Sequence, residues 1–169
     1  MDITELILHD HHEQRRQFAL LDEAGDDPAV LGPLWDQLAA LLEVHDAAEE
    51  KIFYPRLLDT GQGAGGEDGP ESETRDAIHD HNDIRDAVRA ASDHPVGSTE
   101  WRQGVLDART ANGDHMAEEE RAAIADFRQH ADLATRHQLG VAFAAYEAAH
   151  RTGIEQPDKD ADTYIAKGS

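Results

Sequence analysis

Cysteine is absent from this chain of 169 residues. Disulfide frameworks, thiolate metal sites and cysteine nucleophiles are therefore excluded. Basic side chains are scarce as well, since 15 Lys and Arg stand against 36 Asp and Glu and give a formal net charge of -21. A surface this acidic repels phosphate backbones, so we expect no nucleic-acid partner.

Long apolar runs are also missing. No stretch approaches the roughly 18 apolar residues of a membrane span, and the opening segment MDITELILHDHHEQ lacks the basic and apolar parts of a signal peptide. We therefore expect a cytoplasmic protein with no membrane partner. Aromatic residues make up only 5% of the chain against 39% hydrophobic residues in total. This composition favours helices over sheets.

Apolar residues recur at helical spacing in four segments. Asp2 with Glu5 is a typical helix start, and the second helix begins at either Pro28 or Pro33. Pro55 is expected to limit the second helix, and Ser98 is expected to cap the fourth. The four helices are expected at residues 2–24, from 28 or 33 to about 55, between 70 and 93, and from 98 past 122.

Glycine is concentrated in one place. Five glycines and a proline occur between Gly61 and Pro70 and predict a flexible connection, whereas the other connections are short. Four similar helices with mostly short connections favour an all-α, up-down-up-down four-helix bundle over residues 1–130. We expect an additional C-terminal helix at 131–150 and a polar, loosely ordered tail at 151–169.

Two of the eleven histidines lie on apolar stripes without a neighbouring glutamate. His11 falls on the stripe of the first helix and His81 on that of the third, so both are expected to face the core. Their neighbours His9 and His79 fall on polar faces and are expected in solvent.

The second and fourth helices each place a histidine and a glutamate on the stripe. His45 precedes Glu49 by four residues, and His115 precedes Glu119 by four. This spacing puts both side chains on one face of a helix, one turn apart.

An offset of 70 residues relates these positions in pairs: His11 and His81, His45 and His115, Glu49 and Glu119. The pattern H-D-H-x-x-x-R also occurs twice at this offset, which indicates an internal duplication. The two helix hairpins would point all six side chains at one another in the core, where each uncompensated charge costs several kcal/mol. A metal pair would compensate them. Imidazole and carboxylate without thiolate suit iron, manganese or zinc.

Other charged residues near the stripes are expected to support the site or to lie in solvent. Three glutamates are expected on a solvated helix face, namely Glu50, Glu118 and Glu120. Arg15 and Arg85 are expected to orient nearby carboxylates such as Asp10 and Asp80, which in turn would hold a ligand imidazole.

Taken as a set, these motifs resemble the hemerythrin-like family, specifically its HHE cation-binding domains, over about residues 1–130. The matching words are D-H at Asp10 and His11, H-x-x-x-E-E at His45 to Glu50 before Tyr54 and Pro55, D-H at Asp80 and His81, and H-x-x-x-E-E at His115 to Glu120. The resemblance implies a four-helix bundle with an oxo- or hydroxo-bridged pair of iron ions that meets dioxygen, peroxide or nitric oxide. The implied ligands are His11, His45, Glu49, His81, His115 and Glu119, with the two glutamates as bridges, and no catalytic residue is implied beyond these ligands.

One position departs from the oxygen-carrying members of that family. They have a second histidine four residues before the one that matches His81, and this chain has Ala77 there. One iron would then have an open position for water, peroxide, or a side chain such as Asp46, Tyr54 or Glu120. Tyr54 is expected either as a ligand, as a neighbour of the ligands or as a packing residue.

Catalase-like disproportionation of hydrogen peroxide is the activity that the resemblance and this open position imply. The first alternative is a sensor or binding protein for dioxygen, nitric oxide or iron that carries out no turnover. The second is a metal-free helical interaction module, which would have to tolerate six uncompensated ionisable residues on its stripes. The sequence identifies no protein partner.

Overall fold

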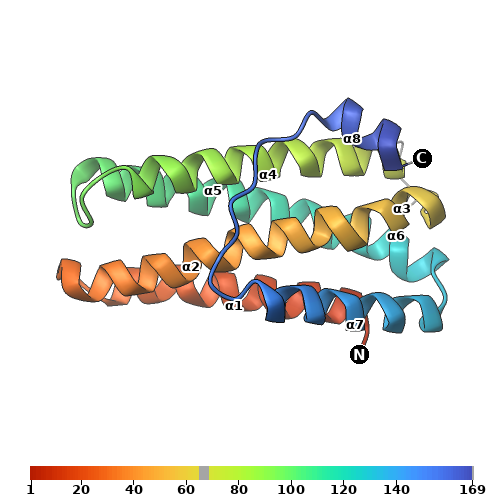
Figure 1. The fold of residues 1–169 in the computed structure, drawn as a ribbon, viewed down its shortest axis with the longest axis horizontal. Helices are drawn as coiled ribbons and strands as arrows, with labels where there is room; N and C mark the ends of the chain where they lie inside the picture. Colours follow the sequence, from red (N-terminus) through yellow and green to blue (C-terminus); the bar gives the residue numbers. More distant parts are fainter. Residues whose placement is uncertain (65–68, 169) are drawn as a thin grey trace.

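The computed structural model describes residues 1–64 and 69–168, which form helices and connections without any strand (Figure 1). The elements in chain order are α1 (Ile3–Glu23), α2 (Pro28–Ala48), the π-helical turn η1 (Glu49–Phe53), α3 (Tyr54–Thr60), α4 (Pro70–Ser92), α5 (Thr99–Arg121), α6 (Ala123–His130), α7 (Leu133–Ala149) and α8 (Ala161–Gly168). Residues 65–68 of the predicted glycine-rich connection lie outside the described residues.

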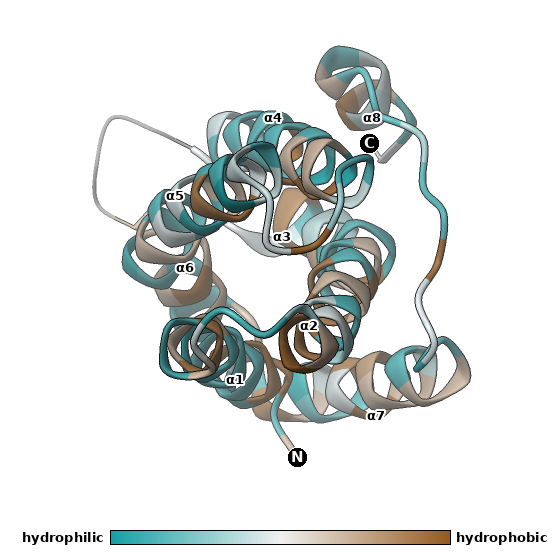
Figure 2. Ribbon diagram, turned by 90° about the vertical axis from the view of Figure 1, so that its left-hand side faces the viewer, coloured by the Kyte–Doolittle hydropathy of each residue, from teal (hydrophilic) through white to brown (hydrophobic). Residues whose placement is uncertain are grey.

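Four long rods make an up-down-up-down bundle, which confirms the predicted fold class. The rods are α1, the run α2–η1–α3, α4, and the run α5–α6. Figure 2 shows the extra helices outside this bundle, α7 beside α1 and α2 and α8 beside α4. None of the helices among the described residues is both long and apolar enough to cross a membrane.

Side-chain caps fix where the helices begin. Asp2 accepts a hydrogen bond from the Thr4 amide, and Asp27 accepts one from the Ala29 amide, so α2 starts at Pro28 and not at Pro33. Ser98 caps α5 and Asp132 caps α7 in the same way. Each cap satisfies an amide that the helix itself leaves without a partner.

Both helices that carry a His-x-x-x-Glu pair are irregular directly after it. After Glu49 the second rod widens into η1, in which the Tyr54 amide bonds to the Glu49 carbonyl. In the fourth rod, the backbone at Ala122 departs from helical angles with φ -112° and ψ -79°. The second rod does not end at Pro55 as expected, since α3 continues it to Thr60. Proline is tolerated there because a new helix begins and its missing amide costs little in a first turn.

The apolar core consists of two clusters with a polar layer between them. One cluster gathers around the start of α1, α3 and α6 and includes Ile7, Phe53 and Phe127. The other lies toward the opposite end and includes Trp35 and Trp101. The stripe histidines and glutamates occupy the space between these clusters, because they interrupt each stripe near its middle.

The C-terminal segment is more ordered than the sequence suggests. Instead of a loosely ordered tail, residues 151–160 cross from α7 over α2 to α4, where α8 packs (Figure 1). Polar contacts hold this segment, and they include Arg89 with Asp158 at 2.9 Å and Asn82 with the Lys159 backbone at 2.8 Å. The polar composition of this segment therefore reflects contacts with polar and charged side chains of α4.

Candidate metal centre

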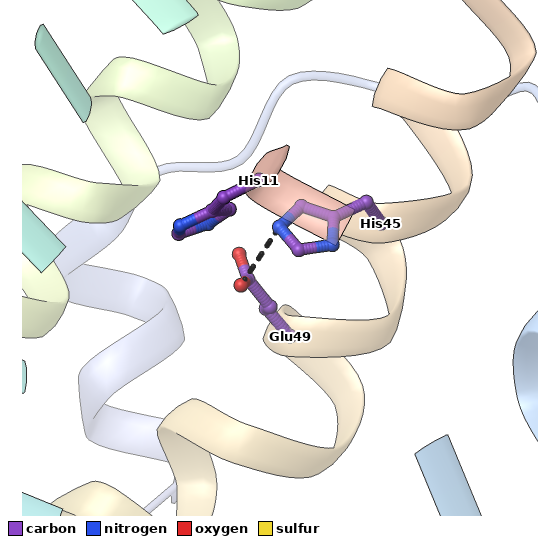
Figure 3. A group of neighbouring side chains, drawn as sticks. All are labelled: His11, His45 and Glu49. Atoms are coloured by element: carbon purple, nitrogen blue, oxygen red, sulfur yellow. Dashed lines mark ion pairs between the residues drawn. The ribbon is translucent and has the colours of Figure 1, made fainter. Parts of the chain in front are cut away.

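Four histidines converge in the polar layer, one from each of α1, α2, α4 and α5, and each is at most 2% exposed. The imidazole rings form two pairs. Those of His11 and His45 have centroids 5.2 Å apart, and those of His81 and His115 have centroids 4.6 Å apart. The four Nε2 atoms lie toward the carboxylates of Glu49 or Glu119, and Figure 3 shows His11, His45 and Glu49 close together.

Glu49 lies between the two pairs and is fully buried. Its Oε1 is 2.9 Å from His45 Nε2 (Figure 3). Its Oε2 is 3.3 Å from His81 Nε2 and 3.8 Å from His115 Nε2. One carboxylate therefore serves two groups that could each hold a cation, one with His11 and His45 and one with His81 and His115.

Glu119, which matches Glu49 in the other repeat, has a different environment. Its Oε2 lies 3.3 Å from His11 Nε2, and its Oε1 accepts a hydrogen bond of 2.7 Å from the Tyr54 hydroxyl. The repeat partner of Tyr54 is Ile124, which cannot donate such a bond. The two halves of the site are thus similar in composition but not equivalent.

A carboxylate supports each imidazole from behind. Each Nδ1 faces one of four carboxylates, with distances of 2.9 Å from His11 to Glu120, 3.2 Å from His45 to Asp10, 2.9 Å from His81 to Glu50, and 3.5 Å from His115 to Asp80. Such contacts fix the ring orientation and the tautomer, and they leave Nε2 free for a metal. The prediction that Asp10 and Asp80 hold imidazoles is confirmed.

The prediction for Glu50 and Glu120 is wrong. Glu50 is only 3% exposed, and Glu120 is partly buried against His11. Arg85 pairs with Glu50 at 3.0 Å, and Arg15 pairs with Glu120 at 2.9 Å, so these arginines orient the glutamates and not the predicted aspartates. Glu118, in contrast, is exposed as predicted.

Burial and charge shift the pKa values of the site in opposite directions. Burial lowers the pKa of His81, but Asp46, Glu49 and Glu50 outweigh it and raise that pKa to about 9. Burial likewise opposes Asp80 and Glu49 at His115, whose pKa rises to about 10. In the metal-free protein these pKa shifts favour the protonated form of each imidazole, and a metal would displace protons from the site.

The unpaired polar atoms of the site test whether a cation fits. Several buried atoms have no hydrogen-bond partner among the described residues, namely Nε2 of His11 and His45, both oxygens of Glu49, both oxygens of Asp46, and Oε2 of Glu119. An unsatisfied buried polar group costs about 1–3 kcal/mol, and more if it is charged. The histidine and glutamate atoms among them each lie 2.9–3.3 Å from another donor of the site, so cations between them would satisfy these atoms.

The distance between two imidazoles agrees with this fit. His81 Nε2 and His115 Nε2 lie 3.1 Å apart. Two nitrogens at about 2.0–2.1 Å from one ion would be separated by about 2.9 Å at a right angle and about 3.4 Å at a tetrahedral angle. The observed distance lies within that range, so the donors present fit a metal.

The three side chains expected as additional ligands lie in different places. Asp46 is fully buried with its Oδ1 3.8 Å from His81 Nε2, on the inner side of the site. Tyr54 contacts the site through Glu119, and burial together with Glu119 and Glu49 raises the pKa of its hydroxyl well above 10. Glu120 lies behind His11 and does not face the interior of the site.

A cavity of about 180 Å³ leads to one side of the site. Its lining includes Tyr54, Ala77, His115, Glu119 and Ala123. Both alanines stand where the other repeat has a large residue: Ile7 matches Ala77, and Phe53 matches Ala123. Ile7 and Phe53 are fully buried. The cavity therefore reaches the half of the site that contains His115.

Comparison with known proteins agrees with this geometry. The family model of the hemerythrin HHE cation binding domain matches residues 2–127. The chain belongs to this family. No curated protein and no solved structure matches it. As an HHE domain, the chain carries buried His and Glu clusters that could hold metal ions, and Glu49 belongs to two of these clusters.

Glu147 in α7 of this HHE domain was not expected near the site. Glu147 lies against Asp10 and His45 in a third group of possible ligands. Burial and the charge of Asp10 raise the pKa of Glu147 to about 8, so it is mostly protonated at neutral pH and shares a hydrogen bond with Asp10. No repeat or helical pattern links α7 to the bundle. The positions of Glu50 and Glu120 behind the histidines could have been inferred from the repeat, since these two glutamates are separated by the same 70 residues as the paired histidines.

Proposed function

We propose that this HHE domain holds two iron ions and disproportionates hydrogen peroxide. The observation that carries the proposal is the fully buried Glu49 carboxylate, whose two oxygens face different pairs of histidines and have no hydrogen-bond partner among the described residues. Bridging carboxylates together with imidazoles are donors that suit a pair of iron ions.

Six residues would hold the two ions. Glu49 would serve both ions, since its two oxygens face different histidine pairs, and Glu119 would add a carboxylate on the His11 side with its orientation set by Tyr54. Asp46 is a further carboxylate on the His81 side. The proposed ligand set is His11, His45, Glu49, His81, His115 and Glu119.

A bound pair of iron ions would supply two-electron redox chemistry, by which two molecules of hydrogen peroxide become two of water and one of dioxygen. The protein's own residues supply access and orientation. Ala77 leaves open the space that a histidine fills in the oxygen-carrying relatives, and the cavity there reaches His115 and Glu119. Tyr54 keeps its proton and donates a hydrogen bond to Glu119 Oε1, beside the reaction space.

The acidic lining of the cavity bears on the choice of reactant. Among the described residues of this lining, acidic side chains outnumber the one arginine, Arg121, and they include Glu73, Asp76, Asp80 and Glu118. A negative cavity disfavours anions, and it admits neutral molecules such as hydrogen peroxide, dioxygen and nitric oxide. The same lining supports binding of dioxygen or nitric oxide at the open position.

Iron content, visible spectrum and oxygen evolution test this function together. We expect about two irons per chain after anaerobic loading, absorption of a bridged iron pair, and release of one dioxygen per two peroxides consumed. Two irons without oxygen release would overturn the proposed peroxide disproportionation. The protein would then be a sensor or an iron-binding protein, and its spectrum should change with dioxygen or nitric oxide. Failure to bind any of iron, manganese and zinc would overturn the metal site itself.

A further inference from the structure

The C-terminal segment, residues 151–168, runs over the outside of the bundle as a strap. After α7 the backbone turns at Gly153, where φ is +97° and only glycine is unstrained, and it lies so close to α2 that a Cβ on Gly153 would be 3.6 Å from the Ala40 side chain. It then reaches α4, where α8 packs. The strap therefore connects the two sides of the bundle (Figures 1 and 2).

Several polar contacts fix the position of the strap on α4. Arg89 donates to the Gln156 carbonyl at 2.8 Å and to Asp158 at 2.9 Å. Asn82 donates to the Lys159 carbonyl at 2.8 Å and accepts from the Lys159 amide at 3.0 Å. Because Asn82 both donates to and accepts from the Lys159 backbone, the position of that backbone is fixed. The point from which the Lys159 side chain extends is fixed with it.

The side chain of Lys159 contacts Glu50, the carboxylate that lies behind His81 in the candidate metal centre. Its Nζ donates to Glu50 Oε2, while Glu50 Oε1 lies 2.9 Å from His81 Nδ1 and accepts from Arg85 at 3.0 Å. Two cations thus neutralise a carboxylate that is almost fully buried. They allow Glu50 to stay charged at the position where it orients His81.

A second contact of the strap provides a hydrogen-bond donor for a backbone carbonyl of η1. In a π-helical turn the Glu50 carbonyl would accept from the amide of residue 55, but that residue is proline and has no amide proton. The Tyr164 hydroxyl donates to this carbonyl instead. Side chain and backbone of Glu50 are therefore both held by the strap.

The matching half of the site has a simpler support. Glu120, the repeat partner of Glu50, is held by His11 and Arg15, and its side chain remains 31% exposed. Only the His81 half receives contacts from the strap among the described residues. This difference separates the strap's effect on His81 from a general effect on the bundle.

We infer that the strap is a positioning element of the metal centre, in which Lys159 acts through Glu50 to hold the His81 imidazole toward one of the two metals. Lys159 is a positioning residue and touches no ligand atom directed at the metal. The inference rests on the proposed two-metal site. It assigns a role to a segment beyond residue 127, outside the part that matches the family.

Cobalt(II) substitution tests the inference without any measurement of activity. We expect the wild-type protein to bind two Co²⁺ ions and to show paramagnetically shifted, exchangeable N–H signals from its ligand imidazoles. In Lys159→Met one of these signals should move or exchange faster with water, and one of the two ions should leave to a chelator about 10-fold faster, a typical effect of losing such a support. Lys159→Arg should restore both.

Two further variants serve as controls. Arg15→Met changes the matching support in the other half and should perturb a different imidazole signal, and Lys167→Met removes an exposed lysine of α8 and should perturb none. Identical signals and release rates in Lys159→Met and wild type would overturn the inference while leaving the metal site intact. A wild-type protein that binds no Co²⁺ would overturn both the proposed function and the inference.

Discussion

Glu49 and Glu119 occupy matching positions in the two repeats but use their carboxylates differently. Both oxygens of Glu49 face histidines, whereas Glu119 directs one oxygen to His11 and the other to Tyr54. Glu49 therefore contacts both halves of the candidate site, whereas Glu119 contacts one half and its hydroxyl partner.

The first prediction concerns this difference. Glu49→Gln should lower the Co²⁺ bound from about two ions per chain to fewer than one, because an amide bridges two cations poorly and places a donor among imidazoles. Glu119→Gln should retain more metal. Equilibrium titration with metal analysis measures both, and circular dichroism shows whether each variant is folded. Full binding of two ions by Glu49→Gln would contradict the shared-ligand assignment.

Tyr54 provides a second prediction. Tyr54→Phe should lower the free energy of unfolding by about 1 kcal/mol, because Glu119 Oε1 loses its partner in a buried place. Metal should also dissociate about 10-fold faster, since Glu119 is no longer oriented. Thermal unfolding and chelator competition measure the two effects. Tyr146→Phe, which changes a tyrosine outside the site, is the control, and equal behaviour of the two variants would refute the role.

Much of the site was predictable because helical spacing and a repeat are local signals. His11 and His81 stand out as polar residues on apolar stripes, and the 70-residue offset relates them to each other. A residue on the stripe of a regular bundle helix must face the core, whatever its partner in space is. The convergence of the six residues could therefore be expected without the three-dimensional structure.

The residues that surround the histidines and glutamates of the site were harder to predict from helical spacing and the repeat. Glu50 was expected in solvent because a run of charged residues on a helix usually forms a solvated face. It is nevertheless buried, because α4 and the strap cover that side of the helix. The Lys159 contact joins residues 109 positions apart and follows no period, so no pattern in the sequence indicates it.

A third prediction uses the cavity beside Ala77. Ala77→Ile gives this position the residue that stands at Ile7 in the other repeat, and it should fill the space that leads to His115. Because the side chain enters a cavity and not a packed core, the stability cost should stay below about 1.5 kcal/mol. We expect unchanged metal content and a peroxide reaction at least about 10-fold slower, which corresponds to about 1.4 kcal/mol in the barrier.

The control for this variant is Ala77→Ser, which changes polarity but hardly changes volume. Stopped-flow mixing of the iron-loaded protein with hydrogen peroxide measures the reaction, and metal analysis of the same samples verifies loading. If Ala77→Ile reacted as fast as the wild type with full metal content, the cavity would not be the route by which the reactant arrives.

The last prediction concerns the pH dependence of the metal-free protein. His81 and His115 have folded-state pKa values of about 9 and about 10, above their ordinary value of 6.5. The stability that they contribute is therefore fully present below pH 6.5, and it is lost as the pH rises through 9 and 10. Between pH 7 and pH 10 the metal-free protein should lose at least about 1 kcal/mol, or about 2–4 °C in Tm.

Metal should reverse this trend. Deprotonated imidazoles are the form that binds a cation, so a rise in pH from 6 to 8 should strengthen binding and raise the Tm of the metal-loaded protein relative to the metal-free one. Calorimetry of both forms in matched buffers measures the two slopes. A metal-free Tm that stays level or rises between pH 7 and pH 10 would show that the buried carboxylates do not hold His81 and His115 in their protonated forms.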